Sequence, residues 1–364
     1  MSREPAGRRT DGGQERPVRA GVVGVGSMGT NHARVYAELR GVELVGVADA
    51  DAERAAEVAA DFGTDAYGVK ELLDRVDVVT VAVPTPYHES VARQCIDAGV
   101  HALVEKPFVD DLDAGAELAA LAEDRGVVLQ VGHIERFNPA VRALPDLLDG
   151  VEPIAITANR LGPPLNREMG DGVVMDLMIH DIDVVLSLVD ADVDRVAATA
   201  TPDEQYATAQ VTFENGVIAS LTASRLTQQK TRTLDITARD RLIRVDYLNQ
   251  SVQIFRQSRP DYLRDNGGVR YRHEVVMEQP MISTGEPLKR ELQAFVDAAT
   301  DGGPVLVSPA DGLRAIDLAR RIEADAESTV RSVETAENAE AAETAESAET
   351  AETAETTDSS EGRQ

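Results

Sequence analysis

The chain has 364 residues, a formal net charge of −28, and only four lysines, Lys70, Lys106, Lys230 and Lys289, among its 36 basic residues. This acidic excess, which resembles that of halophilic proteins, excludes a partner bound through its phosphate backbone, so we expect no nucleic-acid partner. A lone cysteine cannot form an internal disulfide, and no stretch reaches the roughly 18 uncharged apolar residues of a membrane helix, so we expect a cytoplasmic protein without membrane contact.

The length predicts two domains, because single hydrophobic cores stop growing at shorter lengths. Residues 1–17 are polar and rich in Arg and Gly, and we expect them to be disordered. Residues 18–137 alternate short Val-rich runs with Ala-rich helical patterns, which is the rhythm of a Rossmann doubly wound parallel sheet. The predicted strands of this α/β domain are 18–23, 43–48, 76–83, 100–104 and 127–131.

A glycine-rich run, Gly24-Val25-Gly26-Ser27-Met28-Gly29, follows the first predicted strand and opens a helical pattern. Such glycines permit a tight turn, a close approach of the backbone to a pyrophosphate, and packing of helix against strand. The second strand ends in an aspartate whose carboxylate can accept hydrogen bonds from an adenosine ribose and repels a 2′-phosphate. We therefore predict NAD rather than NADP as cofactor, bound by Gly24, Gly26, Ser27, Met28, Gly29 and Asp49.

The segment Glu105-Lys106-Pro107 directly follows the strand 100–104, at the carboxyl edge where doubly wound sheets bind ligands. Lysine is so scarce in this chain that one at this edge suggests a role, although a surface lysine paired with Glu105 is the plainer alternative. Together with Pro84 and His88, which follow the strand 76–83, Glu105 and Lys106 complete the predicted cofactor site.

Charged and polar residues cluster in 132–139, where the chain crosses between the domains, a usual place for a substrate pocket. Asn138-Pro139 alone is typical of a helix start, with Asn as the cap and Pro in the first turn. This interpretation leaves Arg136 unexplained. We therefore take Arg136 as a candidate substrate-binding residue.

Residues 138–327 are predicted to form an α+β domain with a large open, mainly antiparallel sheet. The runs 154–160, 207–213, 217–222, 233–237 and 242–247 alternate apolar with polar residues, as half-buried strands do. Asn215-Gly216 predicts a hairpin with a type I′ turn. Asn159, Arg160 and the loop 161–172 are expected to shape the substrate pocket, and the open sheet face to form a homodimer or homotetramer.

Acidic residues recur at every third position from Glu334 to Glu361, so a helix there would have no apolar stripe to dock. We expect 328–364 to be a disordered acidic tail, with an interaction tail as the alternative.

The apolar run 173–189 is interrupted by polar residues at helical spacing, Asp176, His180, Asp183 and Ser187. On a helix these four form one narrow stripe along an otherwise apolar rod. The stripe could be the solvent-exposed side of an amphipathic helix. Because the rest of the circumference is apolar, we expect a mostly buried helix whose stripe faces a cavity and binds a polar ligand.

The glycine run, Glu105-Lys106-Pro107, the stretch 132–139 and Asp176 to His180 together resemble the signature set of the Gfo/Idh/MocA oxidoreductase family. The resemblance covers about 18–327. It implies that Lys106, Asp176 and His180 form the catalytic group beside an NAD or NADP in the Rossmann domain, and that the open sheet makes oligomers. Within the family, the stretch from His133 to Ala140 is similar to UDP-N-acetylglucosamine 3-dehydrogenases.

The expected reaction is therefore the NAD-dependent oxidation of a secondary hydroxyl on a sugar or sugar nucleotide. His180 would accept the hydroxyl proton, and Lys106 would stabilise the developing charge on that oxygen. Asp176 would orient the substrate or tune the imidazole, and no metal is expected. The leading substrate is UDP-N-acetylglucosamine, oxidised at C3. The alternatives are an inositol or free-sugar dehydrogenase and, in another class, a non-catalytic NAD-binding regulator.

Overall fold

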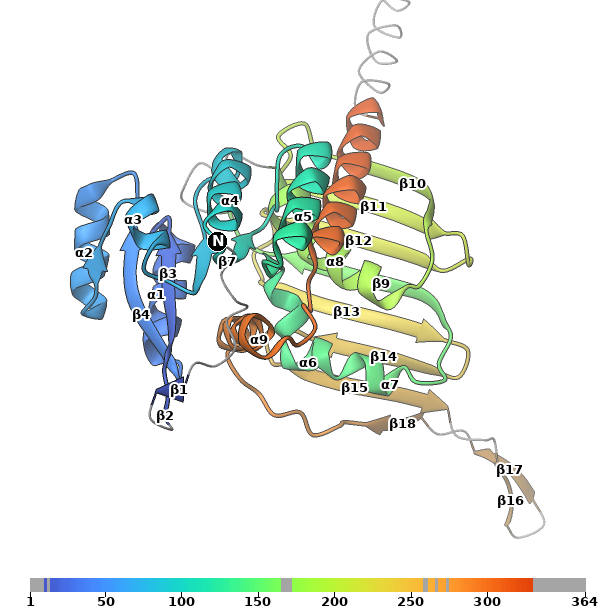
Figure 1. Ribbon diagram of the computed structural model, residues 1–364. Coiled ribbons are helices and arrows are strands. Elements are labelled where there is room, and N and C mark those ends of the chain that lie inside the picture. The colour runs from blue at the N-terminus through green and yellow to red at the C-terminus, as the bar shows by residue number, and fades with distance from the viewer. Residues whose placement is uncertain are drawn as a thin grey trace, which may run out of the picture.

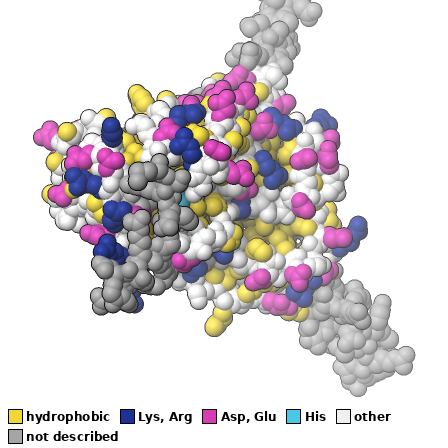
Figure 2. Space-filling model, in the orientation of Figure 1, with side chains coloured by type: hydrophobic (Ala, Val, Ile, Leu, Met, Phe, Trp, Pro, Cys, Tyr) yellow, Lys and Arg dark blue, Asp and Glu magenta, His cyan; other side chains and the backbone are white. Residues whose placement is uncertain are grey.

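The computed structural model describes residues 10–11, 14–164, 172–257, 261–265, 268–272 and 275–329. Figure 1 shows two sheets, with α4 and α5 lying between the first sheet and the second. None of the described helices is both long enough and apolar enough to cross a membrane. Acidic side chains are spread over the face seen in Figure 2, among fewer Lys and Arg.

The first sheet is parallel and has the strand order β5-β4-β3-β6-β7-β8. Its strands are β3 (Val18–Val23), β4 (Val42–Ala48), β5 (Asp65–Ala66), β6 (Val78–Val81), β7 (His101–Glu105) and β8 (Leu129–Gly132). The connecting helices are α1 (Ser27–Glu38), α2 (Ala52–Phe62), α3 (Val69–Leu73), the short η1 (Thr85–Tyr87), α4 (His88–Asp97) and α5 (Leu112–Arg125). This order, with β3 central, confirms the predicted doubly wound sheet.

Two short strands, β1 (Thr10–Asp11) and β2 (Gln14–Glu15), pair antiparallel within the segment that we expected to be disordered. The expectation was wrong for these four residues. Backbone pairing supplies the hydrogen bonds there, which composition alone does not reveal.

The second sheet has the order β10-β11-β12-β9-β13-β14-β15-β18. Its strands are β9 (Pro153–Leu161), β10 (Val193–Ala200), β11 (Tyr206–Phe213), β12 (Ile218–Ser224), β13 (Thr231–Ala238), β14 (Arg241–Asp246), β15 (Ser251–Gln257) and β18 (Val275–Glu278). Only the β12–β9 pair among these neighbours is parallel, which confirms the predicted mainly antiparallel sheet. A separate hairpin joins β16 (Asp261–Asp265) to β17 (Gly268–Arg272).

The hairpin predicted at Asn215-Gly216 connects β11 to β12. Its turn is not type I′, because Gly216 has φ +85° while Asn215 is not among the residues with positive φ. Gly216 N–H donates to Phe213 O, and the Asn215 side chain accepts from Val217 N–H at 3.1 Å. Gly alone therefore takes the left-handed position of a longer connection.

The helix expected over 173–189 begins with a π-helical turn, η3 (Val174–Met178), before α8 (Ile179–Leu188). The prediction of a regular α-helix was wrong for this turn. Of the predicted polar stripe, Asp183 is buried and Ser187 is exposed, and the apolar side chains of α8 are mostly buried, as expected.

The chain crosses between the sheets through η2 (Ile134–Phe137), α6 (Pro139–Arg142) and α7 (Leu144–Leu147), and it returns through α9 (Pro287–Asp301). Although α9 follows the second sheet in sequence, Leu292 and Phe295 pack in one core with Val22 and Val47 of the first. A last helix over 309–329, drawn in orange-red in Figure 1, binds the edge strand β10 through Asp325, which accepts from Ala198 N–H at 2.6 Å. It extends two residues past the tail boundary predicted at 327.

A buried guanidinium fixes β9 relative to η2 and α8. Arg160 is 4% exposed, and its Nε and NH2 groups donate to the Asp181 carboxylate at 2.7 and 3.0 Å. Its NH1 group donates to Glu135 Oε1 at 3.0 Å, and Tyr247 stacks on the guanidinium. A bidentate pair of this kind holds both geometry and charge in place.

Arg160→Ala should lower the free energy of unfolding by about 3–5 kcal/mol, because it leaves the buried Asp181 carboxylate and the partly buried Glu135 carboxylate without their cation. The matched control, Arg244→Ala, breaks the exposed pair with Asp235 and should cost less than about 1 kcal/mol. Urea unfolding of both variants measures the difference, and equal losses would contradict this role for Arg160.

Candidate active site

The glycine run forms the turn between β3 and α1, and its three glycines meet different constraints. A Cβ on Gly24, whose φ is +87°, would lie 2.6 Å from the backbone of Ala82, and one on Gly29 would lie 1.8 Å from Gly24 O. A Cβ on Gly26 would meet nothing within 4 Å. The protein fold thus requires Gly24 and Gly29, whereas Gly26 keeps the surface open for a ligand.

The start of α1 is suited to an anion. Gly26, Ser27 and Met28 are exposed, and the helix begins with no side-chain cap and no acidic residue in its first turn. The amide groups and the positive dipole end of such a helix bind phosphate. Asp49 lies beside this turn, because its Oδ2 accepts from Val25 N–H at 2.7 Å.

Lys106 and Asp176 meet across the space between the two sheets. Lys106 Nζ donates to Asp176 Oδ1 at 3.0 Å and to the Asp176 carbonyl oxygen at 2.8 Å. Arg225, which directly follows β12, donates to Asp176 Oδ2 at 2.6 Å. The side chains of Lys106 and Asp176 are 17% and 20% exposed, so the pair is not in bulk water. The space between the two sheets where this pair lies is called the crevice below.

The charges around Asp176 determine its ionisation. Burial alone would raise the pKa of Asp176, but Lys106 and Arg225 outweigh burial and hold this pKa below its usual value. The carboxylate is therefore ionised at neutral pH. Since an ammonium group has three N–H donors and Asp176 accepts from two, Lys106 keeps one donor for another oxygen.

The π-helical turn explains how Lys106 reaches a helix carbonyl. A π-turn inserts one residue and breaks the regular ladder of backbone hydrogen bonds, which leaves carbonyl groups available to other donors. Here the carbonyl of Asp176 accepts from Lys106. The helix thus provides two acceptors for one ammonium group, its backbone and its side chain.

His180 follows this turn at the start of α8 and lies partly exposed at the crevice. Its Nδ1 atom is buried and has no hydrogen-bond partner among the described residues. Burial, and next the positive charge of Lys106, hold the pKa of His180 well below the usual value. The imidazole is therefore neutral at pH 7, and this is the form that accepts a proton.

Glu105 lies inside the protein, where it supports the Lys106 segment. Its Oε1 atom lies 2.9 Å from His32 Nε2 on α1, and Oε2 accepts from Lys106 N–H at 3.1 Å. Burial would raise the pKa of Glu105, but His32 outweighs it and lowers this pKa. The predicted cofactor contact of Glu105 remains a prediction, while its observed contacts join α1 to Lys106.

His88 also acts on this segment from within. Its Nδ1 and Nε2 atoms each lie 2.8 Å from a backbone carbonyl oxygen, of Pro107 and Val83 respectively. Both ring nitrogens thus face protein groups, and this geometry does not favour the predicted direct contact with a cofactor. Pro84, by contrast, lines a cavity of about 320 Å³ together with Pro107 and Met175, beside Lys106 and Asp176.

The arginines predicted to bind substrate are held by carboxylates of the protein. Arg136 NH1 donates to Asp183 Oδ1 at 3.3 Å, and Arg160 is bound as described above. Burial raises the pKa of Asp183 to about 7, with Arg136 opposing this shift.

Asn159 and Arg160 are consecutive on β9, so they point to opposite faces of the sheet, and only Arg160 faces α8. A substrate contact by Asn159 within one protomer is thus not supported.

Sequence reasoning missed two arginines of the crevice, Arg225 and Arg232. Arg232, near the start of β13, donates from NH1 to the carbonyl oxygen of Leu161 at 2.6 Å. Its positive charge contributes to lowering the pKa of His180, so it lies near that ring. The only signal in the sequence was their position at strand ends. Among the described residues no cluster of His, Cys, Asp and Glu could hold a metal ion.

Comparison with known proteins identifies relatives along nearly the whole described chain. Residues 18–133 match the family model "Oxidoreductase family, NAD-binding Rossmann fold", and 156–243 match the GFO/IDH/MocA C-terminal domain. The UDP-N-acetylglucosamine 3-dehydrogenase of Acidithiobacillus ferrooxidans is 37% identical over 316 residues, which are 85% of this chain and 98% of that protein. A solved structure of this relative has a TM-score of 0.77 at 36% identity, covering 85% of this chain and 98% of that one.

More distant relatives act on inositols. The scyllo-inositol 2-dehydrogenase (NAD(+)) of Bacillus subtilis is 28% identical over 233 residues, which are 58% of this chain and 68% of that protein. The solved scyllo-inositol dehydrogenase of Lactobacillus casei, with bound NAD(H) and scyllo-inositol, has a TM-score of 0.71 and 19% identity over 86% of this chain and 98% of that one. At this identity the similarity shows a shared fold.

The glycine turn yields a paired prediction. Gly29→Ala should lower the free energy of unfolding by about 1–3 kcal/mol, because the new Cβ collides with the backbone of Gly24. Gly26→Ala should change it by less than about 1 kcal/mol, since its φ of −64° suits alanine, yet weaken NAD binding about tenfold or more by blocking the pyrophosphate. Thermal unfolding and titration with NAD test both, and an equally stable Gly29→Ala would contradict the packing argument.

Proposed function

Because the chain belongs to the Gfo/Idh/MocA family of NAD-binding oxidoreductases, we propose that it oxidises the C3 hydroxyl of UDP-N-acetylglucosamine with NAD. One observation carries the proposal above all. The Lys106 ammonium group is hydrogen-bonded to Asp176 beside His180, at the same sheet edge as the glycine turn. The full-length similarity to a UDP-N-acetylglucosamine 3-dehydrogenase supports the choice of substrate.

The residues present fit the cofactor. The surface at Gly26 is open, the start of α1 has uncapped amide groups, and Asp49 lies at the second strand end where it can accept from ribose hydroxyls. When bound, NAD supplies the acceptor for the hydride that leaves the substrate carbon. The side chains of this chain must therefore bind the alcohol and remove its proton.

His180 is proposed as the base. Its neutral imidazole takes the proton of the hydroxyl as the carbon loses hydride, and Lys106 donates a hydrogen bond to the same oxygen, which stabilises its developing negative charge. Asp176 and Arg225 act as positioning residues in this scheme, because the Asp176 carboxylate fixes the Lys106 ammonium group and Arg225 fixes the carboxylate.

The charge of the crevice favours a sugar nucleotide over a free polyol. Lys106, Arg225 and Arg232 bring three positive charges near Asp176, while Arg160 is neutralised by Asp181 and Glu135. An excess of cations in a chain of net charge −28 suits a diphosphate group, which binds arginine well. A neutral inositol carries no charge that these cations could bind.

We further propose that the second sheet forms a homodimer or homotetramer. Ile218 on β12, which is 43% exposed, pairs with Ala155 of β9, so it lies on the sheet face opposite Arg160 and α8. Apolar side chains on an extended sheet face are typical of a subunit interface. Light scattering of the purified protein would measure the mass, and a monomer at micromolar concentration would refute this proposal.

The proposed reaction predicts NADH formation with UDP-N-acetylglucosamine and little with N-acetylglucosamine or scyllo-inositol. His180→Asn and Lys106→Gln should each lower kcat about 10²- to 10⁴-fold, because each removes a group that acts in the transition state. NAD affinity should stay the same in both variants, and the exposed control Lys70→Gln should keep full turnover.

The outcomes separate the alternatives. Turnover of inositol alone would favour a polyol dehydrogenase, and NAD binding without turnover of any substrate would favour a non-catalytic regulator. Near-normal kcat in His180→Asn would refute the proposed base.

The pH dependence of kcat/KM offers a second test. Since burial and Lys106 depress the pKa of His180, activity should persist as pH falls below about 6.5 and should be lost only at the lower pH where the ring protonates. Lys106→Gln removes a nearby positive charge, so the acid limb of its residual activity should move to higher pH. Lys70→Gln serves as the control, and an unmoved limb in Lys106→Gln would contradict the electrostatic coupling.

A further inference from the structure

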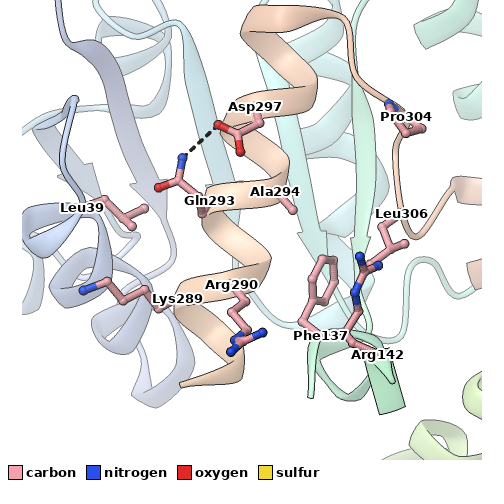
Figure 3. Close-up of a pocket in the computed structure, with 10 residues that line it drawn as sticks. All are labelled: Leu39, Phe137, Arg142, Lys289, Arg290, Gln293, Ala294, Asp297, Pro304 and Leu306. Atoms are coloured by element: carbon pink, nitrogen blue, oxygen red, sulfur yellow. Dashed lines mark hydrogen bonds between the residues drawn. The ribbon is translucent and has the colours of Figure 1, made fainter. Parts of the chain in front are cut away.

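A second cavity of about 490 Å³ lies away from Lys106 and His180, between α1, η2, α6 and α9. This volume lies within the range of small-molecule sites, about 300–1,000 Å³. Leu39, Phe137 and Leu306 form apolar parts of its wall, and Arg142, Lys289 and Arg290 also line it (Figure 3). None of these six residues lines the catalytic crevice.

The cavity is cationic in a strongly acidic protein. Three basic side chains line it, against one carboxylate, Asp297, which accepts from the Gln293 amide at 2.9 Å (Figure 3). Lys289 is one of only four lysines in a chain of net charge −28.

The position of two of these cations on α9 costs stability. Lys289 and Arg290 lie at the start of the helix, whose first turn has no acidic residue; the N-cap residue Glu286 makes no capping hydrogen bond and pairs with Arg34 instead. The helix dipole makes this end positive, so cations there are unfavourable and anions are favourable. A bound anion would compensate the side chains and the helix end together.

We propose that this cavity is an accessory binding site for a small organic anion, one with an apolar or planar body and a phosphate or carboxylate group. The body would lie on Phe137 and Leu306, and the anionic group would meet Arg142 and Arg290, whose donors suit phosphate and carboxylate oxygens, while Lys289 adds positive charge at the edge of the cavity (Figure 3).

The site communicates with the catalytic helix through Arg136. Arg136 precedes Phe137, and its NH2 group donates to the carbonyl oxygen of Leu306 at 3.2 Å. Phe137 and Leu306 both line the cavity. Its NH1 group binds Asp183, three residues after His180 on α8. A ligand that moves Phe137 or Leu306 therefore changes the support of the helix that carries His180.

Calorimetric titration with UMP, citrate and inorganic phosphate, each at saturating NAD so that the cofactor site is filled, tests the site. UMP, which has a planar body, should bind more tightly than citrate or inorganic phosphate, which have neither an apolar nor a planar body. Lys289→Gln/Arg290→Gln should weaken this binding about tenfold or more, since it removes both charges of α9. The control Lys70→Gln/Arg239→Gln removes the same charge from exposed positions and should bind like the wild type. Ala294→Phe keeps the charges but fills the cavity, and should also abolish binding.

Absence of binding by all three probes, or equal binding by wild type and Lys289→Gln/Arg290→Gln, would overturn the site. Binding that disappears when NAD is present would assign the probe to the cofactor site and would equally overturn it. The communication with α8 predicts that a bound probe changes kcat or KM at least about twofold in the wild type and not in Ala294→Phe. Unchanged kinetics at saturating probe would refute that communication, while the binding experiments do not depend on which substrate is oxidised.

Discussion

The hydrogen-bonded ion pair between Lys106 and Asp176 is the contact on which the rest of the site depends. It joins the residue that follows β7 of the first sheet to the π-helical turn η3, which packs against the second sheet. A lysine side chain has many rotamers, and two acceptors on one turn reduce them to one. In the proposed reaction, the reacting oxygen, the nicotinamide and His180 can be aligned only if the two sheets keep this spacing.

Buried polar contacts on both sides make this spacing rigid. In the first domain, Glu105 links the Lys106 backbone to His32, so α1 and the Lys106 segment are held together. On the substrate side, Arg160 links β9 to α8 through Asp181. Such buried ionic groups contribute little net stability when fully paired, but they penalise any arrangement that separates them. Their effect here is positional, since they specify where Lys106 and His180 lie.

The glycine turn, the parallel sheet and the alternating strands could be predicted because each follows from local requirements, such as the positive φ of Gly24 or the period of two in β9. The roles of the arginines could not. From the sequence, Arg136 and Arg160 were expected to bind the substrate. Their observed partners, Asp183 and Asp181, come from a helix more than twenty residues away in the chain. Arg225 reaches Asp176 because β12, which Arg225 follows, packs against η3, and the sequence pattern does not determine this packing.

The charge distribution connects the crevice with the cavity beside α9. A chain of net charge −28 repels anionic ligands at long range, so electrostatic steering cannot bring a nucleotide to either place at low salt. At about 1 M salt the Debye length falls to about 3 Å, and only direct contacts between ligand and cation survive. Recognition must then rest on cations that touch the ligand inside hollows. Lys106, Arg225 and Arg232 lie around Asp176, and Arg142, Lys289 and Arg290 line the cavity beside α9, so a protein with so acidic a chain keeps basic side chains at these two places.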